Sequence, residues 1–229
     1  MVIDNSKIIK KTRRDYNIIA EHFSEKRGRL WPDLKPFLKY VQPGDKVLDA
    51  GCGNGRLYGE LKNKKAAYLG IDFSQKLLEI ARKKHSQADF RQGDLIKRET
   101  WQGLEGFDIC FCLALLHHLP TRFLQLKTLK FIQQSLKKDG LLVLSVWNLW
   151  QKKFWKLHLK QLFWKISQGF KLKWLLVPYR VSDGQKTIKE VNRFCYAFCP
   201  EEIRKLVQEA GFKVKEKKSG RNLCLIAQK

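Results

Sequence analysis

The residues from Val47 to Gly55, which read VLDAGCGNG, have the types and the spacing that could bind a small molecule. An apolar run precedes them, and a helical pattern begins at Arg56. Glycines between a strand and a helix let the backbone turn sharply and approach a ligand, and the helix N-terminus offers free N–H groups. The pattern predicts a site for a ligand that carries a nucleoside. The loop residues expected to contact it are Asp49, Gly51, Cys52, Gly53, Asn54 and Gly55.

Two nucleoside ligands compete for such a loop, a dinucleotide and S-adenosylmethionine. A dinucleotide brings a pyrophosphate dianion, which the carboxylate of Asp49 would repel, whereas this carboxylate suits an ammonium or sulfonium group. The glycine spacing is also G-x-G-x-G rather than G-x-G-x-x-G. Asp72 ends the next apolar run, 21 residues after Gly51, where an acid takes the two hydroxyls of a ribose. We therefore expect S-adenosylmethionine as the cofactor, with Asp72 and Phe73 among its contacts.

Further polar residues follow the third and fourth predicted strands. Asp94 either accepts a hydrogen bond from the adenine amino group or is an ordinary turn residue. Leu95 beside it and Leu113, which ends the fourth strand, complete the expected cofactor contacts. His117 and His118 come next, at the edge that faces the ligand crevice in open α/β sheets. A histidine there is commonly a packed residue, and we expect one of the two, His117, to touch the substrate.

The composition says more about partners than about the fold. Lys and Arg number 46 against 22 Asp and Glu, which gives a formal net charge of +24 over 229 residues. This excess favours nucleic acid or anionic membranes as partners, although a merely basic soluble protein explains part of it. The 6 cysteines form no C-x-x-C pair, so we expect no metal site and free thiols in a reducing cytoplasm. No apolar run is long enough to cross a membrane.

Hydrophobic periodicity predicts strands that alternate with helices, as in a parallel α/β sheet. The expected fold is a Rossmann-like seven-stranded sheet with helices on both faces and an antiparallel strand pair at the C-terminus. Two helical pieces are expected before the sheet, the second beginning at Trp31-Pro32. The single domain 1–229 is divided into an N-terminal helical cap (1–42), a cofactor-binding core (43–147), an insertion or lid (148–192) and a C-terminal helix and strand pair (193–229).

Residues 147–190 have an unusual pattern. Aromatic and aliphatic residues recur at helical spacing in the first half, while Lys152, Lys156 and Lys160 line another face. The segment is a lid that presents cations to RNA, an in-plane membrane anchor, or an insertion that packs on the core with a solvated face. The sequence leaves these three alternatives open. Pro178 predicts a loop within it.

These motifs resemble those of the class I S-adenosylmethionine-dependent methyltransferases. The match rests on VLDAGCGNG, Asp72, Asp94, FDICFCLALLHHL at 107–119 and LKKDGLLVLSVW at 136–147. A narrower resemblance runs almost end to end and is to the tRNA wobble-uridine methyltransferases, which esterify the carboxylate of 5-carboxymethyluridine. It is carried by YNIIAEHFS at 16–24, the adjacent His117-His118, Val146-Trp147 and RFCYAF at 193–198.

This resemblance implies methyl transfer to tRNA and two further substrate contacts. Arg193 would orient the substrate carboxylate through the two N–H groups of its guanidinium fork, unless it forms a structural salt bridge. Tyr196, which stands where the family has His, is the other contact. Eukaryotic members work with a small zinc-binding activator protein, which becomes a candidate partner. Two rival hypotheses are a methyltransferase of a small molecule, lipid or quinone at a membrane surface, and an RNA-binding module without catalysis.

Overall fold

The computed structural model describes residues 4–167, 172–182 and 187–229. The strands are β1 (Lys46–Ala50), β2 (Ala67–Asp72), β3 (Asp89–Gln92), β4 (Phe107–Leu113), β5 (Leu136–Trp147), β6 (Trp174–Ser182), β7 (Thr187–Tyr196), β8 (Lys213–Ser219) and β9 (Asn222–Gln228). The α-helices are α1 (Asn5–Lys26), α2 (Arg56–Leu61), α3 (Gln75–Lys84), α4 (Arg122–Ser135), α5 (Trp155–Ser167) and α6 (Pro200–Glu209). Short 3₁₀ helices are η1 (Lys35–Tyr40), η2 (Arg98–Trp101), η3 (Leu116–His118) and η4 (Lys152–Phe154).

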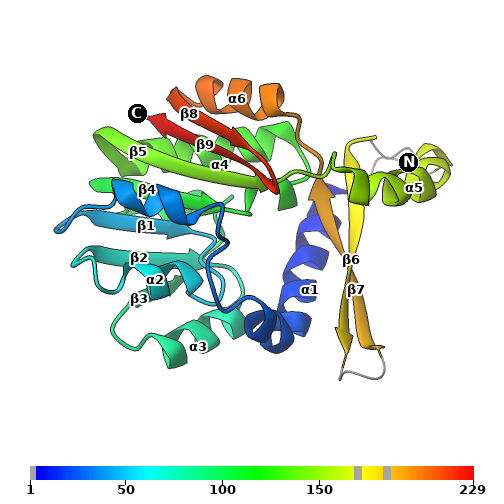
Figure 1. Cartoon of the computed structure of the whole chain (residues 1–229), viewed down its shortest axis with the longest axis horizontal. Coiled ribbons are helices and arrows are strands. Elements are labelled where there is room, and N and C mark those ends of the chain that lie inside the picture. Colours follow the sequence, from blue (N-terminus) through cyan, green and yellow to red (C-terminus); the bar gives the residue numbers. More distant parts are fainter. Residues whose placement is uncertain (1–3, 168–171, 183–186) are drawn as a thin grey trace.

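The main sheet has seven strands in the order β3-β2-β1-β4-β5-β9-β8 (Figure 1). The strands β1 to β5 pair in parallel, and β9 is antiparallel to both of its neighbours, β5 and β8. The predicted seven-stranded sheet with its C-terminal antiparallel pair is therefore confirmed. The strand order reverses between β1 and β4, and ligands bind at such a switch point, beyond the carboxyl ends of the strands.

Alternate residues of the central strands supply two hydrophobic layers, one on each face of the sheet. Leu48 of β1 belongs to a cluster that includes Leu129 of α4 and Leu206 of α6. Its neighbour Val47 belongs to a second cluster, which includes Leu57 of α2 and residues of η1. Near-complete burial of both faces explains the continuous apolar runs of these strands.

The N-terminal part contains two helical pieces, as expected, the long α1 and the short 3₁₀ helix η1. Helix α1 begins where the side chain of Asp4 accepts a hydrogen bond from the N–H of Ser6, at 2.9 Å. The expected start of a second helix at Trp31-Pro32 is wrong, because only the short η1 forms, beginning at Lys35. Pro36, not Pro32, stands in the first turn, where a missing N–H does no harm.

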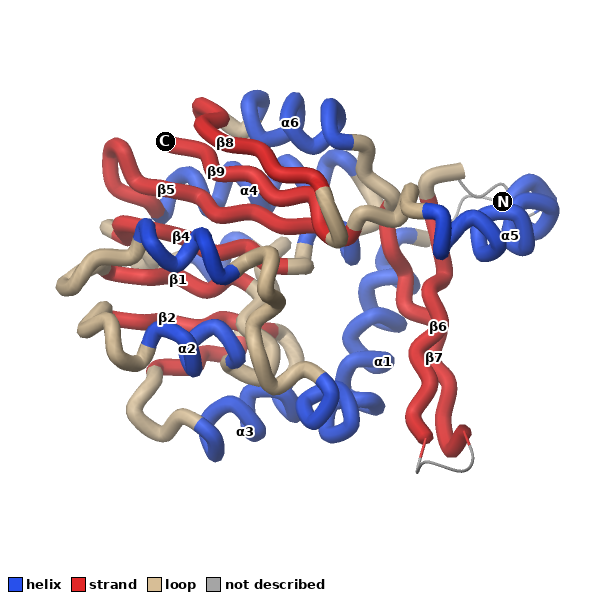
Figure 2. The backbone as a smooth tube through the Cα atoms, viewed as in Figure 1, coloured by secondary structure: helices blue, strands red, loops and turns tan. Residues whose placement is uncertain are grey.

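The insertion after β5 contains a helix and a two-stranded hairpin, which Figure 2 shows projecting beside the main sheet. The hairpin of β6 and β7 is absent from the predicted elements, and Pro178 lies within β6 rather than in a loop. A two-stranded sheet has two edges, so proline can be accommodated there. The hairpin packs on α1, where Tyr179 and Val191 join a cluster with Ile19.

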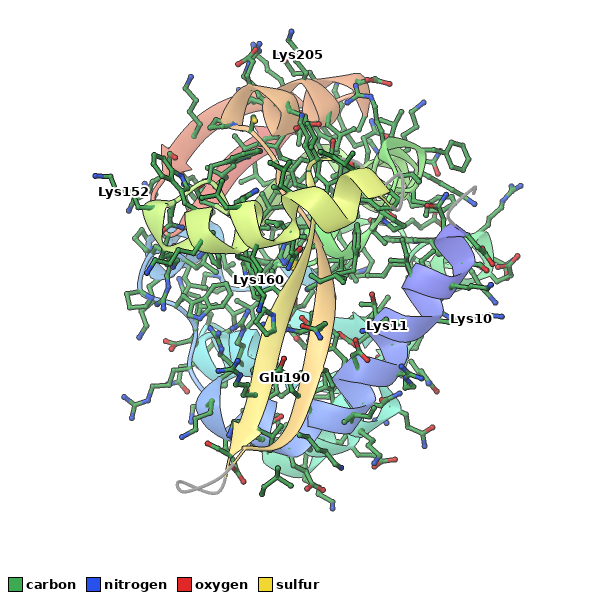
Figure 3. The ribbon with its side chains drawn as sticks, turned by 90° about the vertical axis from the view of Figure 1, so that its right-hand side faces the viewer. Lys10, Lys11, Lys152, Lys160, Glu190 and Lys205 are labelled. Carbon is green, nitrogen blue, oxygen red and sulfur yellow. The ribbon has the colours of Figure 1, made fainter. Side chains whose placement is uncertain are left out.

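Helix α5 lies across the end of the hairpin, as Figure 3 shows, and carries Lys160. Its apolar residues Trp155, Leu159 and Ile166 are 57%, 67% and 66% exposed. In the part of the chain that the structure describes, no helix combines the length and the apolar character needed to span a bilayer.

Candidate active site

The loop between β1 and α2 turns through left-handed glycines, at Gly51, Gly53 and Gly55. It is fixed to β2 because the N–H groups of Gly51 and Cys52 donate to the carbonyl of Ile71, at 2.8 and 3.0 Å. A Cβ atom at Gly55 would lie only 2.9 Å from the ring of Phe90. A Cβ atom at Gly53 would meet no atom within 4 Å. The main chain at Gly53 therefore faces open space, as close approach of a ligand requires.

Asp72 lies at the carboxyl end of β2, directly beside this loop. One of its oxygens accepts the N–H of Gly53 at 2.9 Å, and the other accepts the N–H of Ser74 at 2.8 Å. Burial raises the pKa of Asp72 to about 6, although these N–H groups favour the charged form. An ionised carboxylate can accept about four hydrogen bonds. Asp72 therefore keeps acceptor capacity for the two hydroxyls of a ribose.

Asp49 and Arg56 form an oppositely charged pair of groups at the two ends of the loop. Tyr68 donates its hydroxyl to Asp49 at 2.8 Å, and burial raises the pKa of Asp49 to about 7. Burial lowers the pKa of Arg56 to about 10, an effect that the charge of Asp49 opposes. Nη1 of Arg56 is buried without a hydrogen-bond partner among the described residues. This guanidinium can thus receive a carboxylate, while Asp49 suits a cation.

Two adjoining cavities surround the loop. We call them the loop cavity and the Asp94 cavity. They share Gly51, Asp72, Phe73, Leu115 and His118. Of the other predicted cofactor contacts, Cys52, Gly53, Asn54 and Leu113 line the loop cavity, and Asp94 and Leu95 line the Asp94 cavity. Asp49 and Gly55 line neither, so their contact with the cofactor stays a prediction.

Helix α1 forms one wall of both cavities. Tyr16 lines the loop cavity, while Thr12 and Arg13 line the Asp94 cavity. The carboxylate of Asp94 forms an ion pair with Arg13. Asp94 also accepts the N–H of Ile96 at 3.4 Å, a contact typical of a turn residue, so the two alternatives for Asp94 stay open. A hydrogen bond from adenine to Asp94 stays a prediction.

His118 links η3 to α1 and β7. Its Nδ1 lies 2.7 Å from the carbonyl of Phe194, which can only accept, so Nδ1 carries the hydrogen. Nε2 then accepts the hydroxyl of Tyr16 at 2.8 Å. Burial lowers the pKa of His118 to about 4, so the ring is neutral. His118 is a positioning residue, because both of its nitrogens are taken by other elements of the protein.

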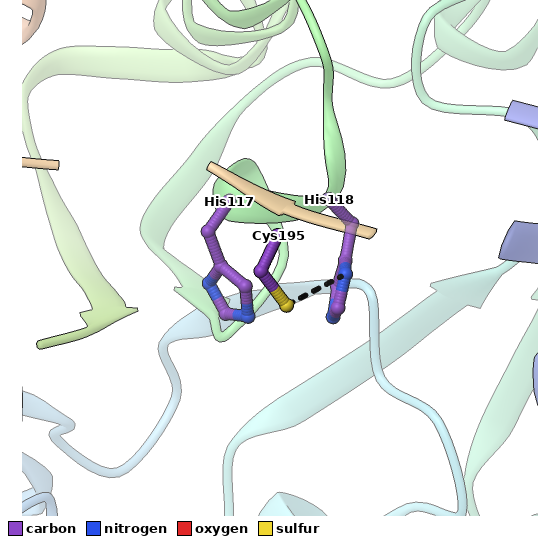
Figure 4. A group of neighbouring side chains, drawn as sticks. All are labelled: His117, His118 and Cys195. Atoms are coloured by element: carbon purple, nitrogen blue, oxygen red, sulfur yellow. Dashed lines mark hydrogen bonds between the residues drawn. The ribbon is translucent and has the colours of Figure 1, made fainter. Parts of the chain in front are cut away.

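His117, His118 and Cys195 lie together, with their candidate ligand atoms within 4.8 Å of one another (Figure 4). A metal ion needs free nitrogen lone pairs and a thiolate. Nδ1 of His118 carries a hydrogen instead, and burial raises the pKa of Cys195 to about 12. The described geometry is that of a packed, hydrogen-bonded group.

His117 is fully buried and packs on Trp147, with 4.9 Å between the ring centres. Its Nδ1 accepts the N–H of Trp147 at 3.5 Å, and its Nε2 has no partner among the described residues. Burial, followed by the nearby His118 and Arg193, lowers the pKa of His117 well below its usual value. His117 does not line the described cavities, so direct contact with substrate stays a prediction.

A third cavity, of about 200 Å³, adjoins the loop cavity through Trp31 and Trp147, which line both. We call it the arginine cavity. Its cationic lining residues are Arg27, Lys153, Arg193 and Arg221. Among the residues that the structure describes, no carboxylate lines it, and none of these cations takes part in an ion pair. The arginine cavity is therefore suited to an anion.

Arg193 is 3% exposed, and its Nε and Nη1 have no hydrogen-bond partner among the described residues. Its guanidinium lies 4.8 Å from the ring centres of both Trp147 and Tyr179. Aromatic faces attract a cation but do not saturate its N–H groups. The alternative of a structural salt bridge finds no partner in the described part of the chain.

Tyr196 is placed differently from the other predicted substrate contacts. It lies three residues after Arg193 on β7, and successive side chains of a strand point to opposite faces. Its hydroxyl donates to Glu202 at 2.6 Å, and it lines none of the described cavities. Contact of Tyr196 with substrate therefore stays a prediction, which this placement does not support.

Several functional candidates escaped the sequence analysis. Arg56 and Arg221 were not singled out, and Tyr16 and Arg27 entered only as part of a family motif. Arg56 directly follows the glycine loop, which is a signal that could have identified it. Arg27 and Arg221 are brought together only by the fold.

The comparisons with known proteins agree with this geometry. A family model described as a methyltransferase domain matches residues 23–217, most of the chain. This chain belongs to the methyltransferase domain family. A curated relative, the tRNA (carboxymethyluridine(34)-5-O)-methyltransferase of Xenopus tropicalis, is 34% identical over 164 residues, which are 67% of this chain and 24% of the relative. The chain thus spans about a fifth to a third of the length of the first such relatives.

Solved structures of methyltransferases share the fold. An S-adenosylmethionine-dependent methyltransferase of Methanosarcina mazei has a TM-score of 0.67 at 21% identity, covering 88% of this chain and 98% of that one. A putative methyltransferase of Haloferax volcanii, solved in complex with the Trm112 methyltransferase activator, gives 0.65 at 17% identity, with 95% and 96% covered. The predicted class I methyltransferase fold is confirmed.

Proposed function

We propose that this methyltransferase transfers a methyl group from S-adenosylmethionine to tRNA, where it esterifies the carboxylate of 5-carboxymethyluridine at the wobble position. The observation that carries the proposal is the pair of unpartnered N–H groups on buried Arg193, in a cationic cavity that adjoins the loop cavity. The curated relative named above acts on the same nucleoside, which supports this choice of substrate.

S-adenosylmethionine supplies a methyl group attached to a positively charged sulfur. The chain offers groups that fit each part of this cofactor. Asp72 retains acceptor capacity for the ribose, Asp49 suits the cationic end, and the orphaned Nη1 of Arg56 suits the carboxylate. The apolar walls of the Asp94 cavity, among them Leu95, suit the adenine ring. Burial of these groups excludes water and strengthens each contact.

A carboxylate acceptor fits the charges and the acid–base groups of the site. Its negative charge needs a cation to hold it, and the fork of Arg193 can donate two parallel hydrogen bonds. The same positive charge keeps a bound carboxyl ionised. Neutral His117 and His118 have lowered pKa values, which makes both poor bases. An ionised carboxylate needs no base, so the reaction depends chiefly on positioning.

The test uses purified protein, S-adenosylmethionine labelled in its methyl group, and tRNA that carries 5-carboxymethyluridine. We expect label in the tRNA that mild alkali removes, because the product is an ester. Unmodified tRNA is the control and should stay unlabelled. Alkali-stable label would move the acceptor to nitrogen, carbon or an ether oxygen.

Two aspects of the cellular setting belong to this proposal. A cytoplasmic location is part of the proposal, and the free thiols, most of them buried, are compatible with such a reducing compartment. A small zinc-binding activator is a candidate partner, which the complex of the Haloferax volcanii neighbour supports. Activity measured with and without such a protein tests the second point.

A second candidate function is methylation of a lipid or quinone at a membrane surface. The exposed apolar residues Trp155, Leu159 and Ile166 of α5 favour it, because lysines flank them as in interfacial helices. Flotation with anionic vesicles discriminates between the two functions. Binding to the vesicles favours the lipid substrate, and its absence together with labelling of tRNA favours the first proposal.

A further inference from the structure

The arginine cavity continues into a larger hollow, which we call the outer groove. The outer groove has a volume of about 810 Å³, against about 200 Å³ for the arginine cavity. Arg27, Trp31 and Arg221 line both, so the two spaces adjoin. The size difference indicates that the inner space holds one chemical group, while the outer groove has room for a longer piece of the same molecule.

The outer groove is lined by cations that the protein leaves mostly without acidic partners. Lys26 and Arg29 are exposed and take part in no ion pair between described residues, whereas Lys35 pairs with Glu60 at 3.3 Å. Glu25 is the one carboxylate among the lining residues. These cations come from the end of α1 and the segment that follows it. The groove therefore presents a row of positive charge that leads to the arginine cavity.

Positive charges repel one another at the junction, the place where the arginine cavity meets the outer groove. The pKa of Arg27 is lowered first by burial and then by the positive charges of Arg193 and Arg221. The guanidiniums of Arg27 and Arg56 both lie over Trp31, at 5.2 and 4.3 Å from its ring centre. Clustered cations of this kind are relieved when an anion binds between them.

We propose that the outer groove binds the phosphodiester backbone of the single-stranded nucleotides that flank the acceptor nucleotide, an inference that rests on the proposed function because it places the acceptor in the arginine cavity. Phosphates along a strand match a row of Lys and Arg. A base enters the inner cavity most easily from an unpaired strand, because a paired base must first be unpaired and unstacked.

The test compares two groove variants, Lys26→Glu and Arg29→Glu, with the matched control Lys205→Glu. Lys205 is exposed on α6, at the far end of the molecule in Figure 3. The probe is a fluorescent anticodon stem-loop RNA, titrated from about 50 to 200 mM salt, a range over which phosphate contacts weaken strongly. We expect each groove variant to bind the RNA roughly tenfold more weakly, with a salt slope smaller by about 1, since one phosphate contact is lost.

Two further measurements separate this inference from the proposed function. Affinity for S-adenosylmethionine and methylation of the free nucleoside 5-carboxymethyluridine should be equal in all three variants and the wild type. Wild-type protein that binds the stem-loop through the groove but, with and without the candidate activator, methylates neither RNA carrying 5-carboxymethyluridine nor the nucleoside would refute the proposed function alone.

Groove variants that bind the stem-loop as the wild type does would overturn the inference, and so would an equal loss in Lys205→Glu. A duplex RNA or polyglutamate that competes as well as the single-stranded loop would also overturn it, since the groove would then recognise negative charge of any shape.

Discussion

The guanidinium of Arg193 lies 4.8 Å from the ring centre of Trp147, so that a buried cation from the hairpin stands over an aromatic ring at the end of β5. This contact joins the second sheet to the main sheet beside the loop cavity, which Trp147 also lines. Its two unpartnered N–H groups leave the buried cation incompletely satisfied. A buried charge in that state costs stability, which indicates a role in binding rather than in folding.

Replacement of Arg193 separates these two roles. Arg193→Lys keeps the charge but loses the fork, and we expect kcat/KM for the modified tRNA to fall by roughly 10- to 100-fold, the value of one or two charged hydrogen bonds. Arg193→Met should abolish methylation yet change the free energy of unfolding by less than about 1 kcal/mol, because an apolar residue of similar length replaces an unsatisfied charge. Methylation assays and urea denaturation measure both. A large loss of stability in Arg193→Met would instead indicate a structural role.

Asp72 should control cofactor affinity. Asp72→Ala removes the carboxylate that accepts the N–H groups of Gly53 and Ser74 and that is expected to hold the ribose. We expect the variant to lose its affinity for S-adenosylmethionine. Binding is measured by the quenching of tryptophan fluorescence as the cofactor is added. Asp108→Ala is the control, since Asp108 is paired with Lys137 outside the three cavities. Binding retained in Asp72→Ala would mean that the cofactor lies elsewhere.

Cofactor affinity should depend on pH through the buried carboxyls. Burial raises the pKa of Asp72 to about 6 and that of Asp49 to about 7, so both are partly protonated in weak acid. The ionised forms are the stronger acceptors, and only they carry the charge that attracts the cationic end of the cofactor, so affinity should be highest well above pH 7 and should weaken as pH falls through 7 and 6. Fluorescence titrations at about pH 5 and about pH 8 check this. Equal affinity at both would contradict it.

The stability of the protein without cofactor should change with pH in the opposite direction. The folded-state pKa of Asp72 lies above the value of 3.8 for an exposed group, so the native state binds more protons than the unfolded state in weak acid. This contribution to stability is present at low pH and is lost as pH rises through about 6. Urea denaturation with Asp72→Asn as control measures it, since the variant should lack this part of the pH dependence.

Replacement of Tyr16 on α1 can be compared with the same replacement of Tyr196 on β7. Tyr16→Phe removes the hydroxyl that His118 accepts, which loosens the contact between α1 and η3. We expect a raised KM for cofactor and tRNA, and a loss of stability of about 1 kcal/mol for the missing hydrogen bond. Tyr196→Phe loses a hydrogen bond to Glu202 outside the cavities, so kcat/KM should be unchanged. A large loss of kcat in Tyr196→Phe would instead support Tyr196 as a substrate contact.

The sequence alone determined the cofactor half of this protein. Glycines at 51, 53 and 55, the acid at 72 and the apolar strands are local patterns, and local patterns are set by backbone sterics and by burial of alternate residues. The sheet and the position of Asp72 beside Gly53 followed from them.

Only the tertiary structure decided the acceptor half. The β6–β7 hairpin was missed because its strands pair with each other and pack on α1, contacts that leave no local period as clear as that of the buried strands. The gathering of Arg27, Arg193 and Arg221 requires three segments far apart in the chain to converge. Tyr196 turned away from the site because the pleat of β7 points successive side chains in opposite directions, and its position beside Arg193 in the sequence could not reveal which face the hairpin would bury.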